Sequence, residues 1–466
     1  DCIEAYRRAI KLDPGFGEAY WSLANLKTFR FTSEDLEQMH AQVRRADLAD
    51  EHRLQLHFAL GKAHEDSHDY GVSFEYYSRA NALHRVATRL VEMSAQAGEC
   101  LTREMGKPFR ESNWEIGASA SSFRYYAELA RHDQGRVSGP VIAGQLQMTL
   151  KEPLGTVVSI VPFNFPVLLF GWQAAAALAA GNAVIVKPSE LTSLTLLMVM
   201  EAFDELPQGL VQTLTGGAAA GRHLVEHRGT HAVAFTGSVP AAQAVAEAAG
   251  KRFKPVLIEA SGNDPFIVMP SAPVEVAAKG AAFAAFLNCG QVCTSAERFY
   301  VHQDVYDRFV AALAREARAL RIGSGLEPID LGPLASSRER DRVERIVARA
   351  VEQGAKVVCG GKRPAHRPQG WFYEPTVLEV THAMDVMHGE CFGPLAPICK
   401  VRDLDEAIAL ANDSDFGLGA NLYTSDLAEA LRSLLLQRDA GTVPAFRRLV
   451  IETTGLADPT PVLSTL

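Results

Sequence analysis

The chain has 466 residues, of which 46 are Lys or Arg and 55 are Asp or Glu, so its net charge is −9. The length predicts about three domains. With 47% hydrophobic and 22% charged residues, the composition is that of a folded globular protein and excludes disorder for most of the chain. The acidic balance argues against a nucleic-acid partner.

Seven cysteines are present, an odd number, and no two are spaced as CxxC. This pattern disfavours a disulfide scaffold or a zinc ribbon and predicts a reducing, cytoplasmic location. The chain begins at Asp1 and not at Met, so we expect a fragment, and no signal peptide is recognised. The most apolar stretch, 157–186, is interrupted by two prolines and two asparagines, which predicts a strand, a loop and a helix and no membrane partner.

Residues 1–85 are predicted to be helical. Apolar positions recur at helical spacing from Ala5 to Leu12 and again over 19–24, and a later pair of helices is expected at 54–63 and 72–83. The run Ala5-Tyr6-x-x-Ala-x-x-Leu-Asp-Pro resembles tetratricopeptide repeats, which stack in units of about 34 residues. An unrelated pair of helical hairpins is the alternative. The resemblance implies a protein partner bound through these helices.

From 86 to 441, strand-like and helix-like segments alternate. The strand-like segments are 155–161, 183–186, 232–235 and 256–258, and the helix-like segments include 168–180 and 241–249. Strands that alternate with helices predict an α/β fold built on a parallel sheet.

A thiol, a carboxylate and an amide stand in this region at the ends of apolar runs. Cys293 lies in a segment rich in small and polar residues, Glu259 ends a strand-like run, and Asn164 is flanked by prolines after another. Together they predict covalent catalysis, in which the thiol is the nucleophile, the carboxylate is a base and the amide binds an oxyanion. Taken alone, the cysteine could equally be a small buried apolar residue.

Seven motifs occur in order along the chain: Pro162–Pro166, Lys187–Glu190, Phe235–Ser238, Glu259–Gly262, Gly290–Ser295, Gly370–Thr376 and Glu390–Pro394. With these motifs, 86–443 resembles the NAD(P)-dependent aldehyde dehydrogenase superfamily. The resemblance implies a Rossmann-like cofactor domain at 86–258, with an arm hairpin near 137–153, and a catalytic domain at 259–443. Segments 286–295 and 417–420 are most similar to enzymes that act on betaine aldehyde or aminoaldehydes.

The resemblance also implies a mechanism. The Cys293 thiolate attacks the aldehyde carbon, and the oxyanion is held by the Asn164 amide and the backbone N–H of Cys293. Hydride passes to a nicotinamide cofactor. Glu259 then activates the water that hydrolyses the thioester, so the expected product is a free acid and not a coenzyme A ester.

Fifteen residues are expected to bind the cofactor, and no residue is expected to bind a metal. The family places the adenine ribose on Lys187 and Glu190, the nicotinamide ribose on Glu390, and the pyrophosphate near Ser238. Since Glu190 would repel a 2′-phosphate, NAD is favoured over NADP; the alternative for Lys187 and Glu190 is a solvated surface pair. The full set is Ile160, Pro162, Phe163, Lys187, Pro188, Ser189, Glu190, Gly221, Phe235, Thr236, Gly237, Ser238, Ala260, Glu390 and Phe392.

The sequence departs from the family pattern near Glu259 and at both ends. Ser261 carries a side chain where the family has Gly, and the oligomerisation strand of the family is not recognised after 443, so the homo-oligomers of relatives are not carried over. In the tail 444–466, the run from Leu449 to Pro459 (Leu-Val-Ile-Glu-Thr-Thr-Gly-Leu-Ala-Asp-Pro) resembles cobalamin-biosynthesis W family GTPase metallochaperones. One hypothesis is therefore a composite or truncated chain. The alternative to an aldehyde-oxidising enzyme is an inactive core within a helical-repeat interaction protein.

Two further motifs are not interpreted as functional sites. The segment 64–68 fits HExxH, but residues 66–69 are expected in a turn between helices, so the two histidines would not share a helix face. The segment 216–221 is glycine-rich, but Arg222 and His223 follow where a phosphate loop has Lys and Ser or Thr. Neither a metalloprotease nor a GTPase is predicted.

Overall fold

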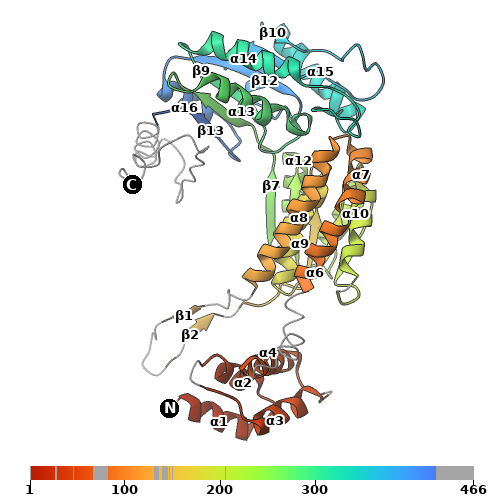
Figure 1. Ribbon diagram of the computed structural model, residues 1–466, viewed down its shortest axis with the longest axis vertical. Helices are drawn as coiled ribbons and strands as arrows, with labels where there is room; N and C mark the ends of the chain where they lie inside the picture. The colour runs from red at the N-terminus through yellow and green to blue at the C-terminus, as the bar shows by residue number, and fades with distance from the viewer. Residues whose placement is uncertain are drawn as a thin grey trace. The chain divides into compact units, whose positions relative to one another are not determined.

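The computed structural model describes residues 2–26, 29–45, 47–66, 82–130, 136–138, 145, 147–149, 151–204 and 206–426 (Figure 1). The chain divides into two compact units. The first comprises Asp1–Thr88 with Phe123–Lys151, and the second comprises Arg89–Ser122 with Glu152–Leu466.

The first unit contains a helical part with its own core. Its helices are α1 (Cys2–Leu12), α2 (Gly17–Ala24), α3 (Ser33–Val43) and α4 (Asp50–Asp66). Tyr20 and Leu23 of α2 pack with Leu60 of α4 in a cluster that excludes solvent. Thr32 begins α3 through a capping box, in which its hydroxyl accepts from the backbone N–H of Asp35 and its own N–H donates to the Asp35 carboxylate.

The predicted helices at 5–12 and 19–24 are confirmed, and α4 is longer than the predicted 54–63. The turn expected at 66–69 is wrong at Asp66, because α4 continues to that residue. The rest of that turn and most of the predicted helix 72–83 lie outside the described residues. A short antiparallel pair, β1 (Arg136–Ser138) with β2 (Gln147–Thr149), occupies the position expected for the arm hairpin.

The second unit contains a five-stranded parallel sheet with the order β5-β4-β3-β6-β7. The strands are β3 (Thr156–Ile160), β4 (Ala183–Lys187), β5 (Val211–Thr213), β6 (Ala232–Gly237) and β7 (Val256–Ala260). The connecting helices are α9 (Pro166–Ala179), α10 (Ser193–Val199) with the 3-10 turn η1 (Met200–Phe203), α11 (Ala218–Glu226) and α12 (Val239–Gly250).

The order of strands in this sheet locates a binding crevice. The chain runs outward from β3 through β4 to β5, then returns to place β6 on the opposite side of β3. Such a reversal is a topological switch point, and open α/β sheets bind ligands there, at the carboxyl ends of the strands.

A second sheet of six strands follows, with the order β10-β11-β12-β9-β8-β13, in which only the pair formed by β10 is antiparallel. Its strands are β8 (Asp264–Val268), β9 (Ala296–His302), β10 (Lys356–Cys359), β11 (Thr376–Val380), β12 (Leu395–Val401) and β13 (Asn421–Tyr423). Its helices are α13 (Val274–Phe286), η2 (Leu287–Gly290), α14 (Tyr306–Ala319), α15 (Ser337–Glu352), η3 (Asp385–Met387) and α16 (Leu404–Asn412).

The largest apolar core lies between this sheet and its helices. Small buried alanines of α13 allow that helix to pack closely against α14, and both helices contact the strands (Figure 1). Three further helices, α6 (Ala82–Glu92), α7 (Ser94–Met105) and α8 (Phe109–Leu129), precede the first sheet in the sequence. Within the described residues, no helix is both long enough and apolar enough to cross a bilayer.

The predicted parallel α/β architecture is confirmed. The first sheet ends at Ala260 and the second begins at Asp264, so the predicted domain boundary at 258/259 falls inside β7. Residues 427–443 of the predicted catalytic domain and the tail 444–466 lie outside the described residues.

Candidate active site

Glu259 lies near the end of β7, and Cys293 lies in the segment that follows η2. Their side chains are in contact. Burial, followed by the negative charge of Glu259 and a hydrogen bond to it, raises the pKa of the Cys293 thiol to about 12. One carboxylate oxygen of Glu259, Oε1, is buried with no hydrogen-bond partner among the described residues. The resting thiol is therefore protonated at neutral pH, and a base with a free acceptor atom stands beside it.

Asn164 is tied to the same segment. It follows β3, is almost fully buried, and donates from Nδ2 to the backbone oxygen of Gln291 at 3.1 Å. A primary amide carries two hydrogens, and this bond uses one of them. The second hydrogen can be offered to an oxyanion, so the structure brings Asn164 close to the cysteine segment, as the sequence predicts.

The segment before Cys293 has an unusual backbone. Asn288, Cys289 and Gly290 have successive φ values of 50°, 58° and 71°, all in the left-handed region. Gln291 holds this turn, because its Nε2 donates to the Asn288 oxygen at 3.0 Å and its Oε1 accepts from the Ala335 backbone at 3.0 Å. Backbone strain of this kind persists where the surroundings fix it, which is common at functional sites.

The two neighbouring cysteines have different environments. Cys289 is 1% exposed and belongs to the large apolar core, so it matches the description of a small buried apolar residue. Cys293 is only partly buried and lies beside a carboxylate. Of the two, Cys293 is the thiol in a position to meet a substrate.

A buried ion pair supports the Asn164 loop. Lys107 and Glu115 lie 2.7 Å apart with fully buried side chains, and the ammonium of Lys107 also donates to the backbone oxygen of Asn164. Glu115 accepts from the N–H groups of Val167 and Leu168 in the first turn of α9, at 2.8 and 3.2 Å. Sequence reasoning missed this pair, because a Lys and a Glu eight residues apart carry no signal of mutual burial.

Ser261 contacts Glu390, the residue expected to bind the nicotinamide ribose. Ser261 has φ of 60°, and its hydroxyl forms a hydrogen bond to Glu390, which also accepts from the N–H of Gly262 at 3.4 Å. Burial still raises the pKa of Glu390. At Gly262 no side chain fits, since a Cβ there would overlap the carbonyl oxygen of Cys293.

A second buried carboxylate, Glu297 of β9, holds the segment after Glu390. It accepts from the N–H groups of Cys391 and Phe392 at 2.7 and 2.6 Å and from Nδ2 of Asn263 at 3.2 Å. Burial raises the pKa of Glu297 to about 8. The signal available in the sequence was a charged residue within an apolar strand, which requires a partner when buried.

The predicted cofactor residues lie at the carboxyl ends of the first sheet's strands or beyond. Ile160, Pro162 and Phe163 end or follow β3, Pro188 and Ser189 follow β4, Phe235, Thr236 and Gly237 end β6, Ser238 caps α12, and Ala260 ends β7. Gly221 lies in α11, and the rings of Phe163 and Phe392 are 6.0 Å apart, edge to face.

Lys187 and Glu190 are not the solvated pair of the alternative interpretation. The side chain of Lys187 is 7% exposed and that of Glu190 is 60% exposed, with Nζ and Oε2 3.8 Å apart. Burial lowers the pKa of Lys187. Gly217 and Gly221 face the two residues, and a Cβ at either position would lie 3.0 to 3.4 Å from them. A buried cation beside glycines at the carboxyl end of β4, one strand from the switch point, fits a dinucleotide cofactor.

Comparison with known proteins identifies similar enzymes. The family model described as "Aldehyde dehydrogenase family" matches residues 27–453. A succinate-semialdehyde dehydrogenase [NADP(+)] of Mycobacterium avium (strain 104) is 38% identical over 385 residues, which cover 80% of each chain. A peroxisomal aminoaldehyde dehydrogenase 2 of Malus domestica is 36% identical, over 76% of this chain and 72% of its own.

Solved structures share the fold. A 3,6-anhydro-L-galactose dehydrogenase in complex with NAP superposes with a TM-score of 0.75 at 37% identity, covering 77% of this chain and 76% of its own. PnpE in complex with nicotinamide adenine dinucleotide gives 0.74 at 36% identity, over 76% and 74%. The family match extends beyond 86–443 at both ends, and these findings show neither tetratricopeptide repeats nor a GTPase-like tail.

Proposed function

The chain belongs to the aldehyde dehydrogenase family and is an oxidoreductase, and from this premise we propose that it oxidises an aldehyde to the free acid through a thioester on Cys293, with NAD as cofactor. The observation that carries the proposal is the contact of Cys293 with Glu259, in a segment to which Asn164 is hydrogen-bonded.

Cys293, Glu259 and Asn164 have separate roles in the proposed reaction. Since the pKa of Cys293 is raised to about 12, its proton must move to a base for sulfur to attack the aldehyde carbon, and Glu259 is the adjacent acceptor. The second amide hydrogen of Asn164 and the backbone N–H of Cys293 stabilise the resulting oxyanion. A bound nicotinamide dinucleotide supplies the hydride acceptor. After Glu259 has released the thiol proton to solvent, it takes a proton from water as the water oxygen attacks the thioester, and protonation of the departing sulfur restores the thiol as the acid is released.

NAD is proposed over NADP because of Glu190. Its exposed carboxylate lies beside Gly217 and close to Lys187, where ribose hydroxyls could donate to it and a 2′-phosphate would be repelled. Some relatives are named for NADP(+), so the choice is tested directly. The kcat/KM for NAD should exceed that for NADP, and Glu190→Gln should reduce this ratio. A wild-type preference for NADP would refute the assignment.

A cationic aldehyde of the aminoaldehyde type is the proposed substrate class. The charged groups that raise the pKa of Cys293 are two carboxylates, Glu259 and Asp264, so the field at the thiol favours a positive substrate over an anionic one. An aminoaldehyde dehydrogenase is among the relatives, as is a succinate-semialdehyde dehydrogenase. The kcat/KM for an aminoaldehyde should exceed that for succinate semialdehyde, and the reverse order would refute the proposal.

The central experiment is a rapid-mixing assay of NADH absorbance with NAD and an aldehyde. The proposal expects a burst of NADH in the wild type and none in Cys293→Ser. Cys359→Ser is the matched control, because Cys359 is also a partly exposed free cysteine but lies in β10. A burst that survives Cys293→Ser, or a folded wild type without turnover, would contradict the proposal.

A further inference from the structure

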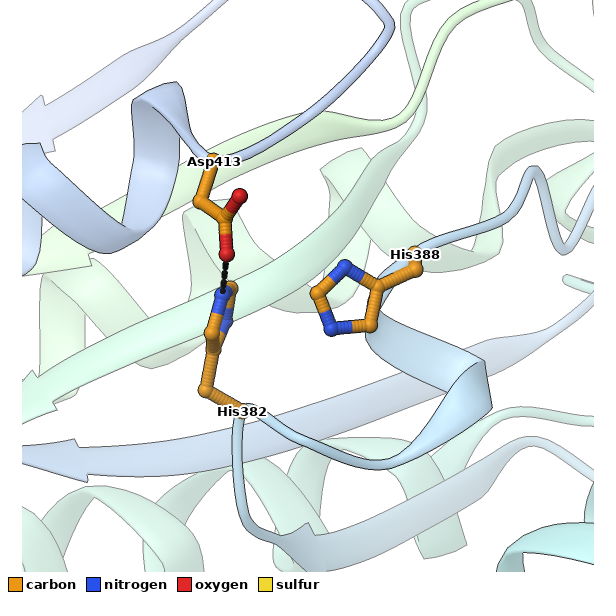
Figure 2. Close-up of side chains that lie close together, drawn as sticks. All are labelled: His382, His388 and Asp413. Atoms are coloured by element: carbon orange, nitrogen blue, oxygen red, sulfur yellow. Dashed lines mark hydrogen bonds and ion pairs between the residues drawn. The ribbon is translucent and has the colours of Figure 1, made fainter.

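Two histidines and an aspartate converge outside the candidate active site. His382 follows β11 and His388 follows η3 in the same short segment, whereas Asp413 follows α16 and comes from a separate part of the chain (Figure 2). One ligand atom from each residue lies within 4.8 Å of the others. In the part of the chain that the structure describes, this is the only group of three or more side chains with such an arrangement.

The hydrogen bonds of His382 suggest what the group holds. Its Nε2 is 2.9 Å from Oδ2 of Asp413, and its Nδ1 is 3.1 Å from the hydroxyl of Tyr300. Tyr300 is fully buried, and its hydroxyl is also 3.2 Å from the backbone oxygen of Leu410. When Tyr300 donates to Leu410, the Nδ1–H of His382 donates to Tyr300, and the lone pair of Nε2 then faces a carboxylate oxygen. In that tautomer a proton or a metal ion can lie between the two acceptors.

We propose that His382, His388 and Asp413 bind a divalent transition-metal ion of the Zn²⁺ class. Imidazole and carboxylate are the ligands such ions accept, and three protein ligands leave a fourth position for water. Tyr300 supplies the outer hydrogen bond that metal-binding histidines normally make through their second nitrogen.

The geometry needs two small adjustments. A tetrahedral ion with bonds of about 2.1 Å places its ligand atoms about 3.4 Å apart. Nε2 of His382 and Oδ2 of Asp413 are 2.9 Å apart and must separate slightly, whereas the rings of His382 and His388 are 4.8 Å apart between centroids and must approach. His388 and Asp413 are exposed, so rotation of the His388 side chain can close the remaining gap without displacing the core.

A bound ion would link the segment after β11, the turn η3 and the end of α16. His388 lies two residues before Glu390, and the oxygen of the intervening Gly389 accepts from Nδ2 of Asn263 at 3.0 Å. The ion would thus restrain a segment next to the candidate active site, and the full chain should melt at a higher temperature when it is present.

Co²⁺ is the probe, because its visible absorption reports its ligands. The full chain titrated with Co²⁺ should show bands of nitrogen and oxygen coordination without an intense sulfur-to-cobalt band. His388→Gln and Asp413→Asn, which alter exposed side chains, should each weaken binding at least about tenfold, and Tyr300→Phe should weaken it about 10- to 100-fold. His366→Gln is the matched control, since His366 is an exposed histidine elsewhere in this unit and its variant should bind normally.

Two results would overturn the proposal. One is equal Co²⁺ affinity in the wild type, His388→Gln and Asp413→Asn, with each variant melting like the wild type in the absence of metal. The other is a spectrum dominated by sulfur coordination, which would place the ion on the free cysteines. Zn²⁺ provides a second readout, because it should raise the melting temperature of the wild type and His366→Gln but not that of His388→Gln.

Discussion

At the scale of single residues, the carboxylate of Glu259 has two opposed effects on Cys293. Its charge raises the pKa of the thiol, which lowers the amount of thiolate at rest, while its free oxygen can accept the thiol proton during attack. A thiol held in this way is protected from other electrophiles until a substrate is positioned against it.

Glu259→Gln separates these effects. Removing the negative charge lowers the pKa of Cys293, so alkylation by a neutral reagent at pH 8 should become faster, by about tenfold for each unit of pKa. Steady-state turnover should fall, because the base for thioester hydrolysis is lost. Alkylation of Cys293→Ser, measured in parallel, gives the contribution of the other cysteines. Slower alkylation in Glu259→Gln would mean that proton acceptance outweighs the charge effect.

The motif residues could be predicted from the sequence because each motif is a short, contiguous signature. The environment of Ser261 could be predicted only in part: the departure from Gly is visible, but its hydrogen bond to Glu390 depends on a segment more than a hundred residues away. The same limit applies to Lys107 and Glu297, whose partners include backbone groups brought near by the packing of separate elements.

At the scale of elements, the ion pair of Lys107 and Glu115 anchors the loop between β3 and α9. Lys107→Met leaves Glu115 charged and unpaired in a site without solvent, which should reduce the free energy of unfolding by about 3–5 kcal/mol. The loss of the bond to the Asn164 oxygen should also lower kcat. Urea denaturation followed by tryptophan fluorescence, together with steady-state kinetics, measures both effects.

Two controls accompany this change. The double variant Lys107→Met with Glu115→Gln should be more stable than Lys107→Met alone, because no unpaired charge remains buried. Arg103→Met breaks an exposed i,i+4 pair with Glu99 and should change stability by less than about 1 kcal/mol. If Lys107→Met and Arg103→Met have similar stability, the buried pair does not anchor the loop.

Asp264 connects β8 to the segment before β13, since its carboxylate accepts from the N–H of Gly419 at 2.9 Å. Burial raises its pKa to about 6. Between pH 4 and 6 the Asp264 carboxyl is mostly ionised in the unfolded chain and mostly protonated in the folded chain. Its contribution to the free energy of unfolding therefore falls as pH rises and levels off above about 6.

Asp264→Asn should abolish this dependence while its side-chain oxygen still accepts from Gly419. Relative to the variant, the wild type should lose up to about 3 kcal/mol of unfolding free energy from pH 4 to 7. Urea midpoints measured across this range test the expectation. A difference between the two proteins that stays constant with pH would show that Asp264 ionises normally in the folded state.

The sequence predicts the elements well where their signals are local. Runs of β-branched and apolar residues predict β3, β4, β6 and β7, and the helix predicted at 168–180 corresponds to α9, which begins two residues earlier at Pro166. The order of strands within the sheets could not be predicted from periodicity. In the first sheet, for example, the order depends on the side of β3 on which the chain places β6.

At the scale of the whole molecule, the two compact units have separate cores. The cluster around Tyr20, Leu23 and Leu60 contains only residues of the first unit, whereas Cys293, Glu259 and Asn164 belong to the second. Since cooperative unfolding follows a shared core, we expect the helical part of the first unit to have its own thermal transition.

Leu60→Ala tests this independence. Leu60 is fully buried, so its truncation should cost the helical core about 2–5 kcal/mol. Calorimetry should show one transition moved to lower temperature and another unchanged, and the kcat/KM for aldehyde should be preserved below the first transition. Leu101→Ala is a matched change of a fully buried leucine in the second unit and should shift the other transition. A single transition displaced equally by both variants would show instead that the molecule unfolds as one cooperative body.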